Sequence, residues 1–174
     1  MIEKKINIKK IIKEWIGPVV AAIVIVILIN KLIFFNVYVP TPSMVPTINP
    51  NDKLMVTRIY NMNKIQRGDI IVFYSEELDE RLIKRVIGLP GDHIVIHNGT
   101  VNINGSDIKE EYVKNNADYN GTFDVPKNKF LFLGDNRAGS ADARVWINPY
   151  IDEKFIEGKA VFRFYPFDNV GVLQ

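Results

Sequence analysis

The chain of 174 residues contains no cysteine and only two histidines, and these absences exclude several kinds of site. Without cysteine there is no disulfide framework, no thiolate-ligated zinc and no cysteine nucleophile. His93 and His97 alone leave little material for a histidine-based metal site. Hydrophobic residues make up 47% and charged residues 24% of the chain, a globular balance that excludes disorder and collagen-like repeats.

Most of the chain has no excess of positive charge, because the basic excess lies within the first 35 residues. Residues 1–35 hold six lysines and two glutamates, whereas residues 36–174 hold 16 basic and 18 acidic residues. A nucleic-acid-binding protein carries its basic excess on the folded domain. We therefore expect no nucleic-acid partner.

A long apolar run follows the first lysines. Residues 15–35 are long enough to cross a hydrocarbon core of ~30 Å at ~1.5 Å per residue. Asn30 and Lys31 interrupt the run near one end, where the lysine amine can reach the interface. Lysines before the run are typical of a cytoplasmic flank, so we expect the rest of the chain to be exported. These lysines are Lys4, Lys5, Lys9, Lys10 and Lys13.

Two other interpretations of the apolar run are a buried core helix and a cleaved signal peptide. A core helix does not explain five lysines on one side. Cleavage requires small residues after the apolar core, where residues 34–38 are bulky. We therefore predict a basic cytoplasmic tail at 1–14, a permanent single-pass anchor at 15–35 and an extracytoplasmic domain at 36–174, with membrane lipid as a partner.

The remainder of the chain is predicted to be mainly β. Short runs rich in Val, Ile, Phe and Tyr are separated by turn residues. This spacing favours an antiparallel coiled sheet or barrel-like domain over βαβ units. We predict a small β insertion at about 93–128, with the polar residues 104–128 on the surface, and one short helix at 152–157. The predicted strands are 37–39, 53–59, 69–74, 81–87, 93–97, 100–103, 129–133 and 159–165.

One serine lies in a proline-rich segment directly after the apolar run. Three prolines among residues 40–46 fix φ, and Pro42 forces Thr41 into an extended conformation. A rigid loop that presents Ser43 is compatible with a nucleophile or with an ordinary turn. A serine nucleophile also needs a base.

Histidine and lysine are the two possible bases. His93 and His97 alternate with isoleucines in a predicted strand, which is typical of satisfied or exposed strand histidines. Lys84 shares a strand face with Leu82 and Val86. Burial on such a face lowers a lysine pKa by up to ~3–5 units and makes the amine a base, although an ordinary strand charge fits this segment as well.

A third segment, residues 134–144, combines a Gly-Asp-Asn turn with small residues and a charge pair. It is either a solvated loop or the support of a site. Together with the anchor and the Ser43 segment, it resembles the bacterial type I signal peptidases, the leader peptidases of serine/lysine endopeptidase family S26. The motifs occur in the family's order, at residues 40–47, 67–73, 84–92, 134–144 and 158–166.

The resemblance implies a role for individual residues. Ser43, followed by Met44, matches the nucleophile, and Lys84 matches the general base. Thr41 matches a hydroxyl of the oxyanion hole, and the supporting loop residues are Ser140, which orients the lysine, and the pair Asp142 and Arg144. Candidates for the walls of the substrate pockets are Val39, Met44, Leu82 and Ile83.

The resemblance also implies the reaction. Neutral Lys84 accepts the Ser43 proton, Ser43 attacks the scissile carbonyl, and no metal or cofactor is needed. The expected substrates are secreted preproteins with small residues at positions −1 and −3, with pilins or other surface proteins as further candidates. The expected location is the cell membrane of a Gram-positive bacterium.

The sequence departs from the family's common pattern at three positions. Pro42 stands where glycine is frequent, Ala143 where a small hydroxyl residue is frequent, and Ile147 where glycine is frequent. Pro42 leaves the proposed oxyanion donors in place, because the Ser43 N–H and the Thr41 hydroxyl are retained. The other two departures affect local packing.

Two alternative functions remain for comparison. Some signal-peptidase-like proteins are non-catalytic assembly factors for pili or other surface structures, and the presence of both Ser43 and Lys84 argues against this class. Self-cleaving repressors use the same residue pair. They need a DNA-binding domain and a cytosolic location, which the lysine-flanked apolar run contradicts.

Overall fold

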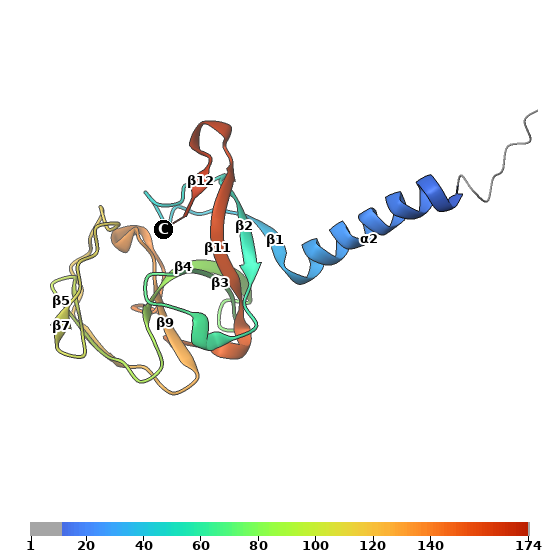
Figure 1. The fold of residues 1–174 in the computed structure, drawn as a ribbon. Coiled ribbons are helices and arrows are strands. Elements are labelled where there is room, and N and C mark those ends of the chain that lie inside the picture. Colours follow the sequence, from blue (N-terminus) through green and yellow to red (C-terminus); the bar gives the residue numbers. More distant parts are fainter. Residues whose placement is uncertain (1–11, 174) are drawn as a thin grey trace, which may run out of the picture. The chain divides into compact units, whose positions relative to one another are not determined.

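The computed structural model describes residues 12–173 (Figure 1). Contacts divide the chain into two compact units, Met1–Phe35 and Asn36–Gln174. The first four lysines of the predicted cytoplasmic tail lie outside the described residues. Each unit is therefore described by itself.

The first unit contains the helix α2 (Gly17–Leu32), which continues a π-helical turn at Ile12–Ile16. Pro18 lies in the first turn of α2, where a missing N–H is tolerated, and Lys31 lies in the last turn. Residues Lys13–Leu32 form the one helix within the described range that is long and apolar enough to cross a membrane. None of the residues of α2 is buried.

The second unit contains an eight-stranded antiparallel sheet, counted over the described residues. Its strand order is β1-β2-β11-β3-β4-β9-β10, and β12 pairs with β11. The register places Ile71 of β3 opposite Lys84 of β4, and Arg85 of β4 opposite Leu133 of β9. The strands are β1 (Phe34–Tyr38), β2 (Lys53–Arg58), β3 (Ile70–Ser75), β4 (Glu80–Gly88), β9 (Lys129–Leu133), β10 (Tyr150–Asp152), β11 (Ile156–Tyr165) and β12 (Gly171–Val172).

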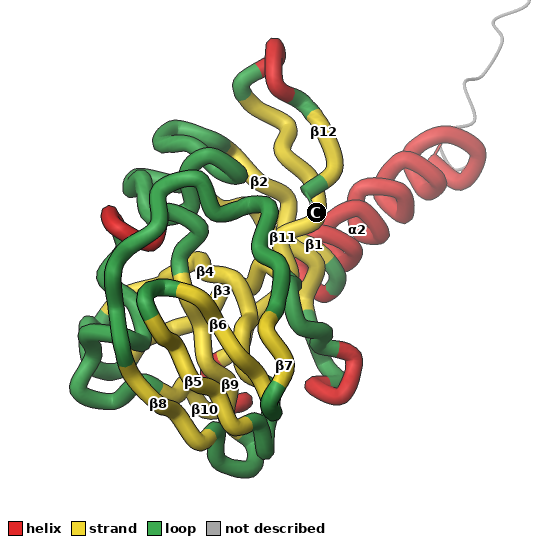
Figure 2. The backbone as a smooth tube through the Cα atoms, turned by 90° about the vertical axis from the view of Figure 1, so that its left-hand side faces the viewer, coloured by secondary structure: helices red, strands yellow, loops and turns green. Residues whose placement is uncertain are grey.

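A smaller four-stranded sheet lies within the segment predicted as an insertion. Figure 2 shows its strands beside one another, in the order β7-β6-β5-β8. The hairpin between β5 and β6 turns at Asn98 and Gly99, both with positive φ, as expected for an Asn-Gly turn. The strands are β5 (His93–His97), β6 (Thr100–Ile103), β7 (Ser106–Asp107) and β8 (Gly121–Asp124).

One hydrophobic core joins the two sheets. Phe73 and Phe132 of the large sheet stack with ring centroids 4.3 Å apart, and Ile94 of the small sheet belongs to the same buried cluster. Residues 70–73 are buried along their whole length, which explains their uninterrupted apolar sequence. The mainly antiparallel β fold predicted from the sequence is confirmed.

The local predictions fail where sequence patterns are ambiguous. The apolar run extends to residue 35, but α2 ends at Leu32 and Phe34 begins β1, since aromatic and β-branched residues also favour strands. The helix predicted at 152–157 is wrong. Only a 3₁₀ turn forms at Glu153–Phe155, where the Asp152 carboxylate accepts a bond of 3.0 Å from the Lys154 N–H, and β11 begins at Ile156. The short strands β7, β8, β10 and β12 were not predicted.

Candidate active site

The loop after β1 holds Ser43 in a compact turn. The Val45 N–H donates to the Pro42 carbonyl at 3.2 Å, and the Ile48 N–H donates to the Met44 carbonyl at 2.9 Å. The side chains of Met44 and Ile48 are fully buried and fix the turn to the sheet. Ser43 is only 5% exposed, so its hydroxyl lies in a partly dry environment.

Lys84 lies in β4 and reaches the serine. The Lys84 amine donates a hydrogen bond of 2.7 Å to Oγ of Ser43, and the lysine is 3% exposed. Burial removes water from the amine and lowers the pKa of Lys84 to about 8, while the carboxylates of Asp142 and Glu80 act in the opposite direction. An amine with this pKa is largely neutral at mildly alkaline pH and can accept the serine proton.

Two further hydroxyls predicted for the site lie near the serine. Oγ1 of Thr41 is 3.5 Å from Oγ of Ser43, on an exposed residue. Oγ of Ser140 is buried and has no hydrogen-bond partner within the described residues, so orientation of the lysine by Ser140 stays a prediction. A Cβ at Gly134 would lie 2.3 Å from Oγ of Ser140 and 2.5 Å from the Ser43 carbonyl. Only glycine therefore fits at position 134.

Asp142 and Arg144 form a buried pair, as a supporting role requires. Nε of Arg144 lies 2.7 Å from Oδ1 of Asp142, with side-chain exposures of 6% and 0%. Oδ2 of Asp142 accepts a bond of 2.9 Å from the Gly134 N–H, and Nη2 of Arg144 donates to the Arg137 carbonyl at 2.6 Å. The pair thus connects the end of the 134–144 loop to its beginning at Gly134 and Arg137.

A second buried ion pair was not assigned a role from the sequence. Nε and Nη2 of Arg85 donate to the two carboxylate oxygens of Asp135 at 2.8 and 2.7 Å. The hydroxyl of Thr47, on the Ser43 loop, donates to Oδ2 of Asp135 at 2.5 Å. The signal was in the strand pattern, because a charged Arg85 on the face shared by Ile83 and Ile87 needs a buried counter-ion.

A groove of about 300 Å³ lies beside the serine–lysine pair. Of the four residues predicted to wall the substrate pockets, Val39, Leu82 and Ile83 line this groove, together with Lys84. Met44 is 0% exposed and lies beneath the Ser43 turn instead. The groove is open to solvent, and its walls combine apolar side chains with the polar and charged ones of Thr41, Glu80 and Arg81.

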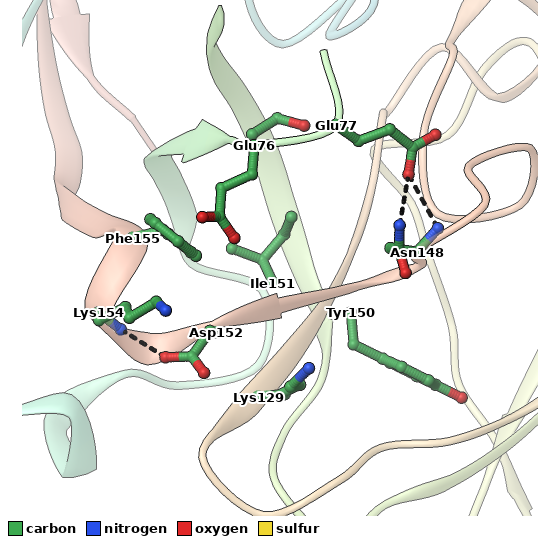
Figure 3. A pocket seen from close by; sticks show the side chains of 10 residues that line it. Glu76, Glu77, Lys129, Asn148, Tyr150, Ile151, Asp152, Lys154 and Phe155 are labelled. Carbon is green, nitrogen blue, oxygen red and sulfur yellow. Dashed lines mark hydrogen bonds between the residues drawn. The ribbon is translucent and has the colours of Figure 1, made fainter. Parts of the chain in front are cut away.

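Other parts of the domain lie apart from this arrangement. His93 and His97 are exposed on β5, as predicted, and Nδ1 of His93 lies 2.6 Å from an Asp124 carboxylate oxygen. A second cavity, of about 290 Å³, contains none of the predicted site residues (Figure 3). At its edge Glu77 accepts hydrogen bonds from the backbone N–H groups of Ile147 and Asn148, which lower the pKa of the Glu77 carboxyl.

The departures from the common family pattern are accommodated locally. Ala143 is buried at 2% exposure, where its small side chain fits the core. Ile147 is 86% exposed, although the preceding Trp146 packs edge-on against Phe73. Pro42 offers its carbonyl to Nδ2 of Asn136 at 3.1 Å.

A serine and a buried lysine in hydrogen-bond contact on an antiparallel β scaffold form the arrangement that serine hydrolases of the serine/lysine type use. The family model described as signal peptidase, peptidase S26, matches residues 12–165. The chain belongs to this family, and it is therefore a serine endopeptidase that removes signal peptides. The comparisons do not support the non-catalytic alternative.

Individual relatives agree with this membership. The chain is 40% identical to the signal peptidase I of Leptolyngbya laminosa, over 92% of this chain and 83% of the relative. It is 32% identical to the signal peptidase I of Bacillus licheniformis, over 97% and 96%. The crystal structure of a signal peptidase I from Enterococcus faecalis is 31% identical, with a TM-score of 0.51, and the match covers 57% of this chain and 98% of that one.

Proposed function

We propose that Ser43 is the nucleophile and Lys84 the general base. The observation that carries this assignment is the 2.7 Å contact between two side chains that are each nearly withdrawn from water. With Lys84 neutral, the proton on Oγ passes to Nζ as Oγ bonds to the scissile carbonyl carbon. The ammonium of Lys84 then protonates the departing amine nitrogen as the C–N bond breaks.

Hydrolysis of the resulting acyl-enzyme uses the same pair. Lys84 takes a proton from water, the hydroxide oxygen bonds to the acyl carbon, and Oγ of Ser43 leaves and recovers the proton. The Ser43 N–H and the Thr41 hydroxyl are the proposed donors to the oxyanion, and one such donor is typically worth ~2.7–4 kcal/mol. In this proposal Ser140, Asp142 and Arg144 support the lysine from the neighbouring loop.

The proposed substrates are preproteins with small residues at −1 and −3. Val39, Leu82 and Ile83 place branched side chains on the groove, which supports contact with small apolar residues of a substrate. Pilins and other exported surface proteins fall within this substrate class.

The proposed location follows from the first unit. An apolar helix at Lys13–Leu32 is compatible with a membrane-anchored protein. The lysines that precede it favour a cytoplasmic N-terminus at 1–14, an anchor at 15–35 in contact with lipid, and an extracytoplasmic catalytic domain at 36–174 with its insertion at about 93–128. A Gram-positive bacterial membrane is the proposed setting.

The test is cleavage of a preprotein by the detergent-solubilised chain, with mass spectrometry of both products. We expect a single cut after a small residue, and at least an about 1000-fold loss of rate in Ser43→Ala and in Lys84→Ala. The double variant should lose no more than either single one, because the two residues act as a unit. The matched control is the pair His93→Ala and His97→Ala, which should cleave normally. Substantial cleavage by Ser43→Ala would refute the assignment.

A further inference from the structure

We propose that residues 110–115, here called the strap, position the Ser43 loop, with Glu110 as the buried anchor. The strap runs between β7 and β8 of the small sheet, in the stretch whose polarity predicted a surface segment. This inference rests on the proposed role of Ser43. It assigns a positioning function to residues of the insertion.

The first connection is a buried ion pair. Nη1 and Nη2 of Arg137 donate to the two carboxylate oxygens of Glu110 at 2.9 and 2.5 Å. The side chains are 2% and 9% exposed, so Arg137 depends on Glu110 for charge compensation. Nε of Arg137 donates to the carbonyl of Gly134 at 3.0 Å, the glycine whose Cβ position is crowded by Oγ of Ser140 and the Ser43 carbonyl.

The second connection runs through Tyr112. Its hydroxyl donates to Oε1 of Glu110 at 2.7 Å, and its ring lies 4.0 Å from the guanidinium of Arg85. Burial raises the pKa of Tyr112, so the hydroxyl remains a donor across the accessible pH range. Because Arg85 holds Asp135, and Asp135 accepts from Thr47, Tyr112 stabilises the far end of the Ser43 loop as well.

The third connection leads directly to the serine. Nδ2 of Asn115 donates to Oδ1 of Asn136 at 2.7 Å, and the Ala138 N–H donates to the Asn115 carbonyl at 3.1 Å. Asn136 in turn donates from its backbone N–H to the Ser43 carbonyl at 3.1 Å and from Nδ2 to the Pro42 carbonyl. Two hydrogen bonds in series therefore join the strap to the backbone of the nucleophile.

The strap aligns Ser43 with Lys84 and does not contact the substrate. The groove is lined by residues 36–41, 72 and 80–84, so the strap forms no part of its walls. Loosening the strap should therefore displace Ser43 relative to Lys84 while the substrate still binds. Small displacements of reacting groups cost up to about 100-fold in rate. The signature is a fall in kcat with KM retained.

The experiment compares Glu110→Gln with Glu111→Gln in the solubilised full chain. Glutamine keeps the shape at position 110 but removes the charge and one of the two acceptors for Arg137. Glu111 is the matched control, because its side chain is 73% exposed and, within residues 12–173, forms an ion pair only with the exposed Lys109. We expect kcat to fall about tenfold in Glu110→Gln, with KM within about twofold of wild type, and both constants to stay unchanged in Glu111→Gln.

A second variant, Asn115→Ala, keeps the proposal testable if Glu110→Gln fails to fold. Asn115 is exposed, and Asn115→Ala removes one hydrogen bond to Asn136 without opening the core. We expect an about threefold fall in kcat, with KM and the thermal unfolding midpoint retained. Unchanged kcat in Asn115→Ala, or a rise in KM with constant kcat in either variant, would overturn the positioning role.

Ser43→Ala measured in the same assay separates the two proposals. If that variant is inactive and the strap variants behave like wild type, only the strap inference fails. If Ser43→Ala retains activity, the assignment of the nucleophile fails instead.

Discussion

Lys84 and Ser43 are 41 residues apart in the sequence, yet a single hydrogen bond of 2.7 Å joins Nζ of the one to Oγ of the other. The lysine is opposite Ile71 in the register of β3 and β4, and Ile71 is fully buried. An ammonium in this position loses most of its hydration, which is why the pKa of Lys84 falls to about 8. Burial of the Lys84 amine therefore both makes it a usable base and lowers the stability of the fold.

We predict that Lys84→Met stabilises the fold near pH 7. There the native lysine is charged and poorly hydrated, whereas the unfolded chain keeps a normal lysine with a pKa of ~10.4. The lowered pKa corresponds to a penalty of at most about 3 kcal/mol, which methionine does not carry. Between pH 8 and pH 10.4 the unfolded state binds the extra proton, so the stability of the wild type rises with pH and the gain from Lys84→Met shrinks.

The measurement is denaturant unfolding of both solubilised chains from pH 7 to pH 10.5. The free-energy difference between them should be largest at pH 7. A pH-independent difference would show that Lys84 is not desolvated in the native state.

The Arg85–Asp135 pair should dominate the polar contribution to stability in the catalytic domain. Its side chains are 3% and 0% exposed, and Asp135→Asn removes the buried carboxylate that accepts two hydrogen bonds from Arg85. We expect a loss of about 3–5 kcal/mol in the free energy of unfolding. The matched control is Glu157→Gln, which breaks the more exposed pair between Arg81 and Glu157 and should cost about 1 kcal/mol or less. Equal losses in chemical denaturation of the two variants would contradict this ranking.

Sequence reasoning predicted the fold class and the placement of Lys84 for identifiable reasons. Strand alternation put Lys84 on the same face as Leu82 and Val86, and the structure pairs Leu82 with Phe73 and buries Lys84 and Val86. The pairing of Ser43 with Lys84 came from the resemblance to a family. A contact across 41 residues follows from the whole fold, and no local pattern encodes it.

The end of α2 and the burial of Glu110 and Tyr112 could not be predicted from local sequence patterns, for physical reasons. The run that ends in Phe34 and Phe35 is apolar enough for a helix and rich enough in aromatic residues for a strand, so its division at Leu32 could not be predicted. Glu110 and Tyr112 stand in a polar stretch that resembles a solvated surface. Their burial depends on Arg137 of a distant loop and on Arg85 of β4, and these residues come together only in the folded chain.

The topology of the chain gives a separate prediction. The lysine excess precedes the apolar helix, so the C-terminal domain should be exported. A reporter enzyme that folds only outside the cytoplasm should therefore be active when it is fused after Gln174. A second fusion of a reporter that works only in the cytoplasm is the matched control and should be inactive. The reverse pattern would place the catalytic domain inside the cell and contradict the proposed substrate class.

The central claim is that Lys84 acts on Ser43 as a neutral base, and the pH dependence of kcat/KM tests it most directly. The substrate is a short peptide with alanine at −1 and −3, and Lys84→Arg is the comparison because arginine keeps its charge at all accessible pH values. The account predicts that the wild-type rate rises with pH through an apparent pKa of about 8 and that Lys84→Arg is inactive throughout. An apparent pKa near the ~10.4 of free lysine, or clear activity in Lys84→Arg, would contradict it.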